Sequence, residues 1–174
     1  MPRFLLPLLA PALFASTAAA ADSVQLPLRK PGLWDIQMRH EGNKLPNMSI
    51  SQCTSEAVDR EFTSEFAPAA KQSCEKTDIQ KTATGYVSDS VCSAAGATVK
   101  THAETTGDFN SAYTVKVTTH SEGGRLGTRD TAMTLTAKWI GECKPGQKPG
   151  DVIMPGGFKM NLHDMQKMKA LLPK

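Results

Sequence analysis

The chain is 174 residues long and carries 20 basic and 17 acidic residues, a formal net charge of +3. This length suffices for one domain with a hydrophobic core, and the mixed charge lacks the basic stripe that nucleic-acid binding requires. After the N-terminal segment, no apolar stretch approaches the roughly 20 residues of a membrane-spanning helix. We therefore expect neither a nucleic-acid partner nor a membrane span in the mature protein.

Residues 1–21 have the three parts of a secretory signal peptide. They carry a positive charge at Arg3, an apolar run over residues 4–14, and small residues at the end. The run is shorter than the roughly 20 residues that span a bilayer, and Pro7 and Pro11 would disrupt a helix there. We therefore predict a cleaved signal peptide rather than a retained membrane anchor.

The mature chain is predicted to begin at Ala21 or Asp22, because both cuts follow an A-x-A pattern. Its first cysteine is Cys53, far from either cut, so we expect no lipid anchor. We expect residues 22–174 to form a single soluble domain in an oxidising compartment, namely the bacterial periplasm.

Four cysteines in an exported chain predict two disulfides. The segment from Cys74 to Cys92 has the pattern of a hairpin with its turn at the midpoint, which places the two cysteines opposite each other, where they can be bridged. Cys53 and Cys143 then pair by elimination. The alternative is a zinc site, but the sequence has no C-x-x-C or C-x-x-H spacing.

Alternating apolar and polar residues predict two strands in the first part of the mature chain, over residues 31–39 and 47–53. Residues 54–72 have the spacing of a helix, with Thr54 as its predicted N-cap. The hairpin over residues 74–92 follows this helix.

Three more alternating runs follow, over residues 97–105, 111–119 and 131–140, and residues 120–128 predict a long glycine-rich loop. Residues 161–171 predict a short C-terminal helix. Together these elements predict a mainly β, α+β fold. We expect a curved antiparallel meander of about seven strands, with one helix after the second strand and one at the C-terminus. The pattern leaves open whether the sheet closes into a barrel.

The opening of the first strand and the cysteine pattern resemble DUF3617, a family of small exported bacterial proteins known as a domain of unknown function. The residues that carry this resemblance are Pro31-Gly32-Leu33-Trp34, Ser51-Gln52-Cys53, the central pair Cys74 and Cys92, Gly141-Glu142-Cys143 and Pro149-Gly150-Asp151. The resemblance covers nearly all of the mature chain. It implies an exported protein of shared fold, and it implies no activity and no functional residues.

Methionines and a histidine gather near the C-terminus, at Met154, Met160, His163, Met165 and Met168. Thioether and imidazole ligands select copper(I), so one hypothesis is a copper-binding protein that uses the last four of these residues. We favour the simpler interpretation that the methionines fill a core-facing stripe. We expect no metal and no other cofactor.

The sequence contains no catalytic motif: Gly-x-Ser-x-Gly is absent, and none of the four histidines lies in a recognised pattern. His102 and Glu104 share one face of a predicted strand, where the carboxylate could orient the imidazole or both could simply be solvated. We therefore expect a protein that is not an enzyme.

A curved antiparallel sheet has a concave face that can hold an apolar ligand or a peptide strand. Trp34, Trp139, Tyr86 and Tyr113 would either line such a face or pack in the core. We expect a non-catalytic ligand-binding or envelope-associated protein, whose partner is a small apolar ligand or an envelope component. The alternatives are the copper-binding protein and an enzyme of unknown type.

Overall fold

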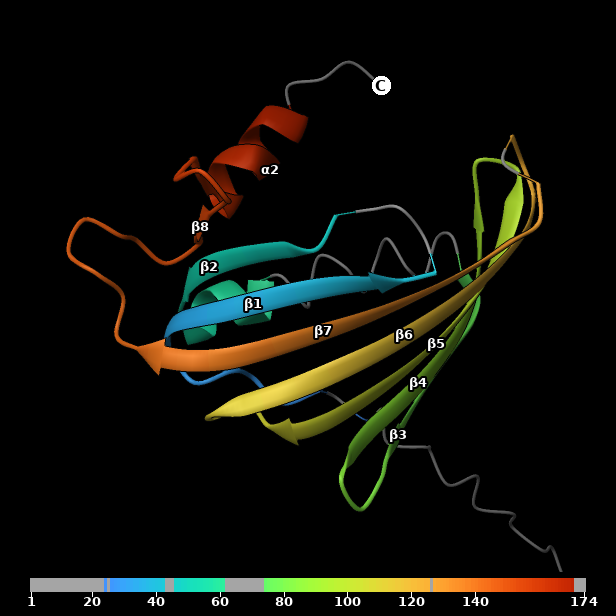
Figure 1. Cartoon of the computed structure of the whole chain (residues 1–174), viewed down its shortest axis with the longest axis horizontal. Coiled ribbons are helices and arrows are strands. Elements are labelled where there is room, and N and C mark those ends of the chain that lie inside the picture. The colour runs from blue at the N-terminus through green and yellow to red at the C-terminus, as the bar shows by residue number, and fades with distance from the viewer. Residues whose placement is uncertain (1–23, 25, 43–45, 62–73, 126, 171–174) are drawn as a thin grey trace, which may run out of the picture.

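The computed structural model describes residues 24, 26–42, 46–61, 74–125 and 127–170, and its strands form one antiparallel sheet (Figure 1). The elements are β1 (Gly32–Glu41), β2 (Met48–Thr54), β3 (Cys74–Lys81), β4 (Gly85–Ala94), β5 (Ala97–Asp108), β6 (Ala112–Gly123), β7 (Arg129–Gly141), β8 (Asp151–Ile153), β9 (Lys159–Asn161) and α2 (Leu162–Ala170). Residues 56–61 are also helical, and the rest of the helix predicted over 54–72 lies outside the described residues, as does the predicted signal peptide. No helix within the described ranges is long and apolar enough to cross a membrane.

The order of strands in the sheet is β3-β4-β5-β6-β7-β1-β2-β8-β9, and β3 and β9 are its two open edges. The predicted mainly β fold with an antiparallel sheet is confirmed, and the sheet is not a closed barrel. From β3 to β7 it is a simple meander, whereas β1 lies beside β7 and inserts the first hairpin into the interior of the sheet. The sheet has nine strands instead of about seven, because β8 and β9 are three residues each, too short to give an alternating pattern.

The register gives the sheet one apolar and one polar face. Ile36 lies opposite Ile50 on one side and Ala137 on the other, and Ala137 lies opposite Tyr113. Trp34 is fully buried beside this row and completes the core. The predicted alternation is therefore confirmed, and the residues between these positions form the polar face.

Strands β6 and β7 are longer than predicted, and the loop between them is correspondingly shorter than residues 120–128. His120 and Ser121 pair with Asp130 and Arg129 in the ladder, and the Ser121 hydroxyl donates a hydrogen bond to the Arg129 carbonyl at 3.1 Å. The prediction was wrong here because polar residues continue the strands on a solvated face, where hydrophobic alternation gives no signal.

The Pro31-Gly32 step at the start of β1 is required by a close approach between β1 and β7. Gly32 has φ +132°, and a Cβ there would lie 2.4 Å from the Gly141 carbonyl oxygen and 2.5 Å from Trp139 Nε1. Trp139 Nε1 donates a hydrogen bond to the Pro31 carbonyl at 3.0 Å. This motif thus serves packing between the two strands.

Two disulfides, Cys53–Cys143 and Cys74–Cys92, link the sheet internally in the pairing expected from the sequence. Cys74 and Cys92 lie opposite each other in the β3–β4 ladder, as the hairpin pattern indicated. Cys53 lies near the end of β2 and Cys143 follows β7, so this bridge joins two strands that flank β1.

Ser55, not Thr54, caps the helix that follows β2. The Ser55 hydroxyl accepts a hydrogen bond from the Val58 amide at 3.3 Å, the geometry of an N-cap. Thr54 is the last residue of β2, and its hydroxyl donates instead to Asp59 Oδ1 at 2.7 Å. The prediction of Thr54 as the N-cap was wrong by one residue because the strand extends further than its pattern indicated.

A buried ion pair attaches the segment before β1 to this helix. Arg29 Nη2 lies 2.7 Å from Asp59 Oδ1; the side chain of Asp59 is buried and that of Arg29 is 13% exposed. Burial opposes the charge on Asp59, but hydrogen bonds and attraction from Arg29 outweigh it and hold the pKa of the carboxyl below its usual value. Arg29 also donates to Gln52 Oε1 at 3.0 Å, which links the pair to β2.

Candidate functional site

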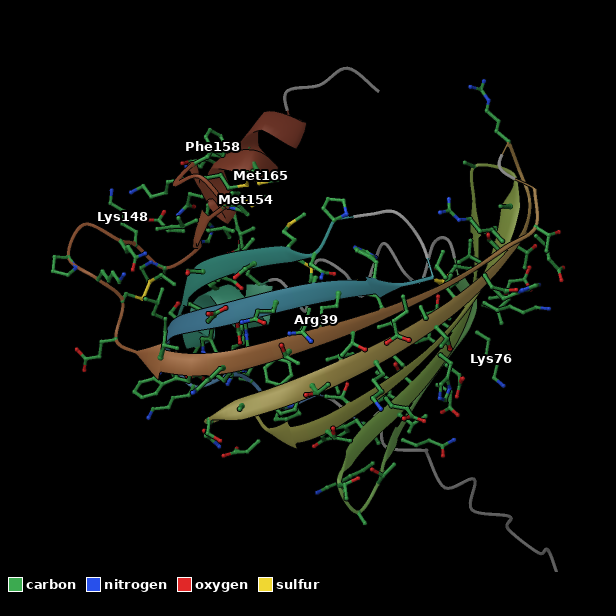
Figure 2. The ribbon with its side chains drawn as sticks, in the orientation of Figure 1. Arg39, Lys76, Lys148, Met154, Phe158 and Met165 are labelled. Atoms are coloured by element: carbon green, nitrogen blue, oxygen red, sulfur yellow. A yellow bond between two sulfur atoms is a disulfide. The ribbon has the colours of Figure 1, made fainter. Side chains whose placement is uncertain are left out.

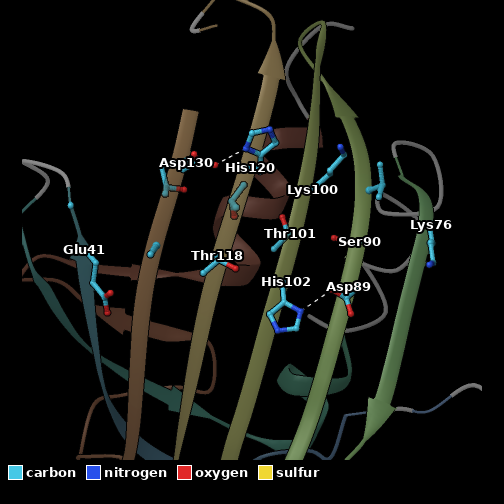
Figure 3. Close-up of a pocket in the computed structure, with 15 residues that line it drawn as sticks. Glu41, Lys76, Asp89, Ser90, Lys100, Thr101, His102, Thr118, His120 and Asp130 are labelled. Atoms are coloured by element: carbon cyan, nitrogen blue, oxygen red, sulfur yellow. Dashed lines mark hydrogen bonds and ion pairs between the residues drawn. The ribbon is translucent and has the colours of Figure 1, made fainter. Parts of the chain in front are cut away.

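A hollow of about 860 Å³ lies on the polar face of the sheet, toward the end where the β6–β7 loop is found (Figure 3). Six strands contribute to it: β1, β3, β4, β5, β6 and β7. Its lining residues are Glu41, Gly42, Lys76, Asp89, Ser90, Val91, Lys100, Thr101, His102, Thr118, Thr119, His120, Asp130, Thr131 and Ala132.

Two rows of cross-strand neighbours place the charged side chains in this hollow. In one row, Asp89, His102 and Thr118 lie opposite one another on β4, β5 and β6. In the next, Lys100 lies opposite His120, which lies opposite Asp130. Adjacent strands are about 4.8 Å apart, so each row forms a line of donors and acceptors across the sheet.

His102 is held between two carboxylates. Its Nδ1 lies 2.8 Å from Asp89 Oδ1 on the neighbouring strand, and its Nε2 lies 3.5 Å from Glu104 Oε1 on its own strand. Hydrogen bonds to Asp89 and then to Glu104 raise the pKa of His102 above its ordinary value. The predicted pair of His102 and Glu104 is therefore present, and Asp89 is a partner that the sequence pattern did not indicate.

His120 on β6 also lies between two carboxylates, as His102 does on β5. Its Nδ1 lies 2.5 Å from Asp130 Oδ1 and its Nε2 lies 2.9 Å from Glu122 Oε1. Hydrogen bonds to Asp130 and Glu122 raise the pKa of His120, and the hydrogen bond from His120, aided by the charge of Lys100, lowers the pKa of Glu122. The sequence pattern did not indicate this site, because it predicted a loop at His120, which lies on β6.

Both histidines therefore have each ring nitrogen engaged by a carboxylate, and their raised pKa favours the imidazolium form. A general base needs a free ring nitrogen within reach of a substrate proton, and neither imidazole offers one. The lining is also balanced in charge, with two lysines and three carboxylates besides the histidines.

The four aromatic residues considered for a concave binding face pack largely in the core. Trp34 lies 5.6 Å from the ring of Tyr113, which stacks on Phe109 at 4.6 Å, and Phe109 meets Tyr86 edge to face at 6.3 Å. Trp139 is half-buried and covered by Lys30, whose Nζ lies 3.6 Å from the ring centroid. These contacts account for the aromatic residues without a ligand.

The residues of the copper hypothesis partly come together at the C-terminal end. Met160, His163 and Met165 line a hollow of about 500 Å³, and the side chain of Met168 lies outside what the structure describes. Two lysines and two aspartates, Lys148, Lys159, Asp151 and Asp164, line the same hollow. His163 Nδ1 lies 3.2 Å from Glu61 Oε2. The copper site stays a prediction. Among the described residues, no three His, Cys, Asp or Glu side chains are grouped for a metal ion.

A family model described as "Protein of unknown function (DUF3617)" matches residues 29–143. The chain belongs to the DUF3617 family. The matched part of this DUF3617 chain begins at Arg29 of the buried ion pair and ends at Cys143 of the longer-range disulfide, and it contains the whole polar hollow. Comparison with curated proteins and with solved structures finds no match.

Proposed function

We propose that this DUF3617 protein is a non-catalytic binding protein of the periplasm, and that it holds a neutral, hydroxyl-rich ligand of the glycan class in the hollow of its polar face. The observation that carries the proposal is the pair of charge-balanced rows across β4 to β7, with Asp89 against His102 in one row and His120 against Asp130 in the next. Two disulfides support the oxidising compartment.

The chemistry of the hollow favours a neutral ligand over a charged one. An anion would meet the carboxylates of Glu41 and Asp89, and a cation would meet the ammonium groups of Lys76 and Lys100. A sugar hydroxyl both donates and accepts hydrogen bonds, so it can use either kind of group. Threonine hydroxyls such as that of Thr118 lie between the charged groups and add further partners.

The pairing of the histidines also supports binding rather than catalysis. A nucleophile and a free base within hydrogen-bond reach are the usual mark of a catalytic site. Here each imidazole lies between two carboxylates at an exposed surface. The hydrogen bonds fix the orientation of the side chains, so less side-chain entropy is lost when a ligand binds.

The test is an NMR titration of ¹⁵N-labelled mature protein with neutral tetrasaccharides of glucose and of N-acetylglucosamine. We expect saturable shifts at Lys100, His102 and His120, and a loss of affinity of at least about tenfold in Lys100→Met. The matched control is Lys116→Met, on the adjacent strand and the same face but outside the hollow. Absence of shifts with every neutral glycan, or equal losses in both variants, would contradict the proposal.

A further inference from the structure

The C-terminal unit, residues 144–170, is attached to the edge of the sheet through its strand β8. Its strand β8 pairs with β2, and Asp151 and Val152 at this junction are buried. Asp151 accepts hydrogen bonds from the Lys148 amide at 2.8 Å and from Asn161 Nδ2 at 2.8 Å. The unit is therefore held in a fixed position on the sheet edge.

Exposed apolar side chains lie at the turn between β8 and β9 and on α2, where Figure 2 labels Met154, Phe158 and Met165 near one another. Phe158 is 65% exposed and Met165 on α2 is 49% exposed. The Met154 amide donates to the Phe158 carbonyl at 2.8 Å, so Met154 lies at the base of the same turn. A phenyl ring exposed to this degree at the tip of a turn gains little from folding, which points to a partner.

The part of the chain that carries these apolar side chains is rich in lysine. Six lysines and two aspartates follow Cys143, a net charge of +4, whereas the chain up to Cys143 has a net charge of −1. Asp151 is buried and lies 3.4 Å from Lys159 Nζ, so it offers little negative charge to the outside. Lys148 and Lys159 line one hollow together with Met165 and the exposed Asp164, which places basic and apolar groups on the same part of the surface.

We infer that the C-terminal unit docks on the surface of a membrane that contains anionic lipid, with Phe158 and Met165 entering the interface and the lysines contacting the headgroups. Apolar side chains flanked by flexible basic ones are the pattern of interfacial membrane binding. Lysine is depleted at protein–protein interfaces, so a lipid surface fits this composition better than a protein partner. The negative remainder of the chain would be repelled, which orients the sheet away from the membrane.

The first test is co-sedimentation of the mature protein with vesicles of phosphatidylcholine alone and of phosphatidylcholine with two-fifths phosphatidylglycerol. We expect binding to the anionic vesicles only, and release as the salt concentration rises. Equal binding to both vesicles, or binding to neither, would overturn the inference. A glycan bound in the polar hollow is a separate property, and neither result depends on the other.

The second test separates the apolar and basic contributions. Phe158→Ser with Met165→Ser should weaken binding at least tenfold, whereas Ile140→Ser, which alters a 50% exposed side chain on β7, should not. Lys144→Glu with Lys148→Glu should weaken it by roughly fivefold or more for each lysine, against Lys116→Glu with Lys138→Glu as the control. All sites are exposed, so circular dichroism should show every variant folded. Losses of equal size in variants and controls would place the contact elsewhere and overturn the inference.

Discussion

The sheet up to Cys143 and the C-terminal unit are built in different ways. Strands β4 to β7 are 10 to 13 residues long and two disulfides bridge that part of the chain, whereas β8 and β9 have three residues each. The histidines on the polar face of the sheet are paired with carboxylates, while the chain after Cys143 has six lysines against two aspartates. The family match covers the first region and stops before the second. Stability is therefore concentrated in the sheet, and surface chemistry that the family model does not cover lies in the unit.

The Cys53–Cys143 bridge should contribute more stability than any other single feature of the sheet. In the chain-entropy model, a loop of 90 residues is worth about 4.6 kcal/mol and a loop of 18 residues about 3.2 kcal/mol. We expect the Cys53→Ala, Cys143→Ala double variant to lose more free energy of unfolding than Cys74→Ala, Cys92→Ala. Urea denaturation without reductant measures both, and the reverse order would contradict the model.

The ion pair of Arg29 and Asp59 should make the next largest contribution to the free energy of unfolding. Asp59→Asn leaves the guanidinium buried without its charge partner, which should cost about 3–4 kcal/mol. The control is Glu56→Gln, because Glu56 pairs with Arg60 at the surface and should contribute less than about 0.5 kcal/mol. Similar losses in the two variants would show that burial does not set the value of the pair.

The same pair should make the sheet sensitive to acid. The pKa of Asp59 is lower in the folded state than in the unfolded state, so its contribution is complete above the unfolded pKa and is lost as the pH falls through the folded pKa. In Asp59→Asn, this part of the acid dependence of unfolding should disappear. An unchanged dependence would mean that other carboxyl groups carry it.

Gly32 and Gly42 provide a comparison between a crowded and an open glycine at the two ends of β1. Both have positive φ, but a Cβ at Gly32 would meet the Gly141 carbonyl, whereas one at Gly42 would meet nothing within 4 Å. Gly32→Ala should therefore cost about 3 kcal/mol and Gly42→Ala about 1 kcal/mol, the backbone strain alone. Equal melting temperatures for the two variants would count against the close approach of β1 and β7.

The smallest effect should appear in the titration of the exposed histidines. Because the pKa of His102 and of His120 is raised in the folded state, each favours folding below its unfolded pKa, and this contribution is lost as the pH rises through the folded pKa. Asp89→Asn should lower the pKa of His102 alone, and Asp130→Asn that of His120 alone. Imidazole NMR signals followed against pH measure both, and a shift of both histidines in either variant would show that they titrate as one group.

Period-2 alternation was enough to predict the sheet, its apolar face and the hairpin that carries Cys74 and Cys92. It also placed His102 and Glu104 on one face, since two residues apart on a strand is a local relation. It could not supply Asp89 or Asp130, because a partner on another strand depends on the register of a hairpin. The Ala95-Gly96 turn, where both residues have positive φ, fixes that register for Asp89.

Contacts between distant parts of the chain could not be predicted from the alternation of apolar and polar residues. The pairing of Arg29 with Asp59 joins a segment without regular structure to a helix, and no periodicity relates such positions. The place of β1 beside β7 was missed for the same reason, since alternation identifies strands but not their neighbours. The sequence pattern left two alternatives open for the aromatic residues, and only their ring contacts in the structure favour the core.

The place of β1 also determines the order in which the chain can fold. Leu33 pairs with Gly141, so the first strand to be synthesised cannot be enclosed until β7 has been made. Until then Trp34 and Ile36 lack the strand that buries them, and Cys53 lacks its oxidation partner. Non-local pairing of this kind slows folding, which lengthens the time for which apolar surface is exposed to aggregation. The earliest strand of the finished sheet therefore has one of its two neighbours only after β7 has been made.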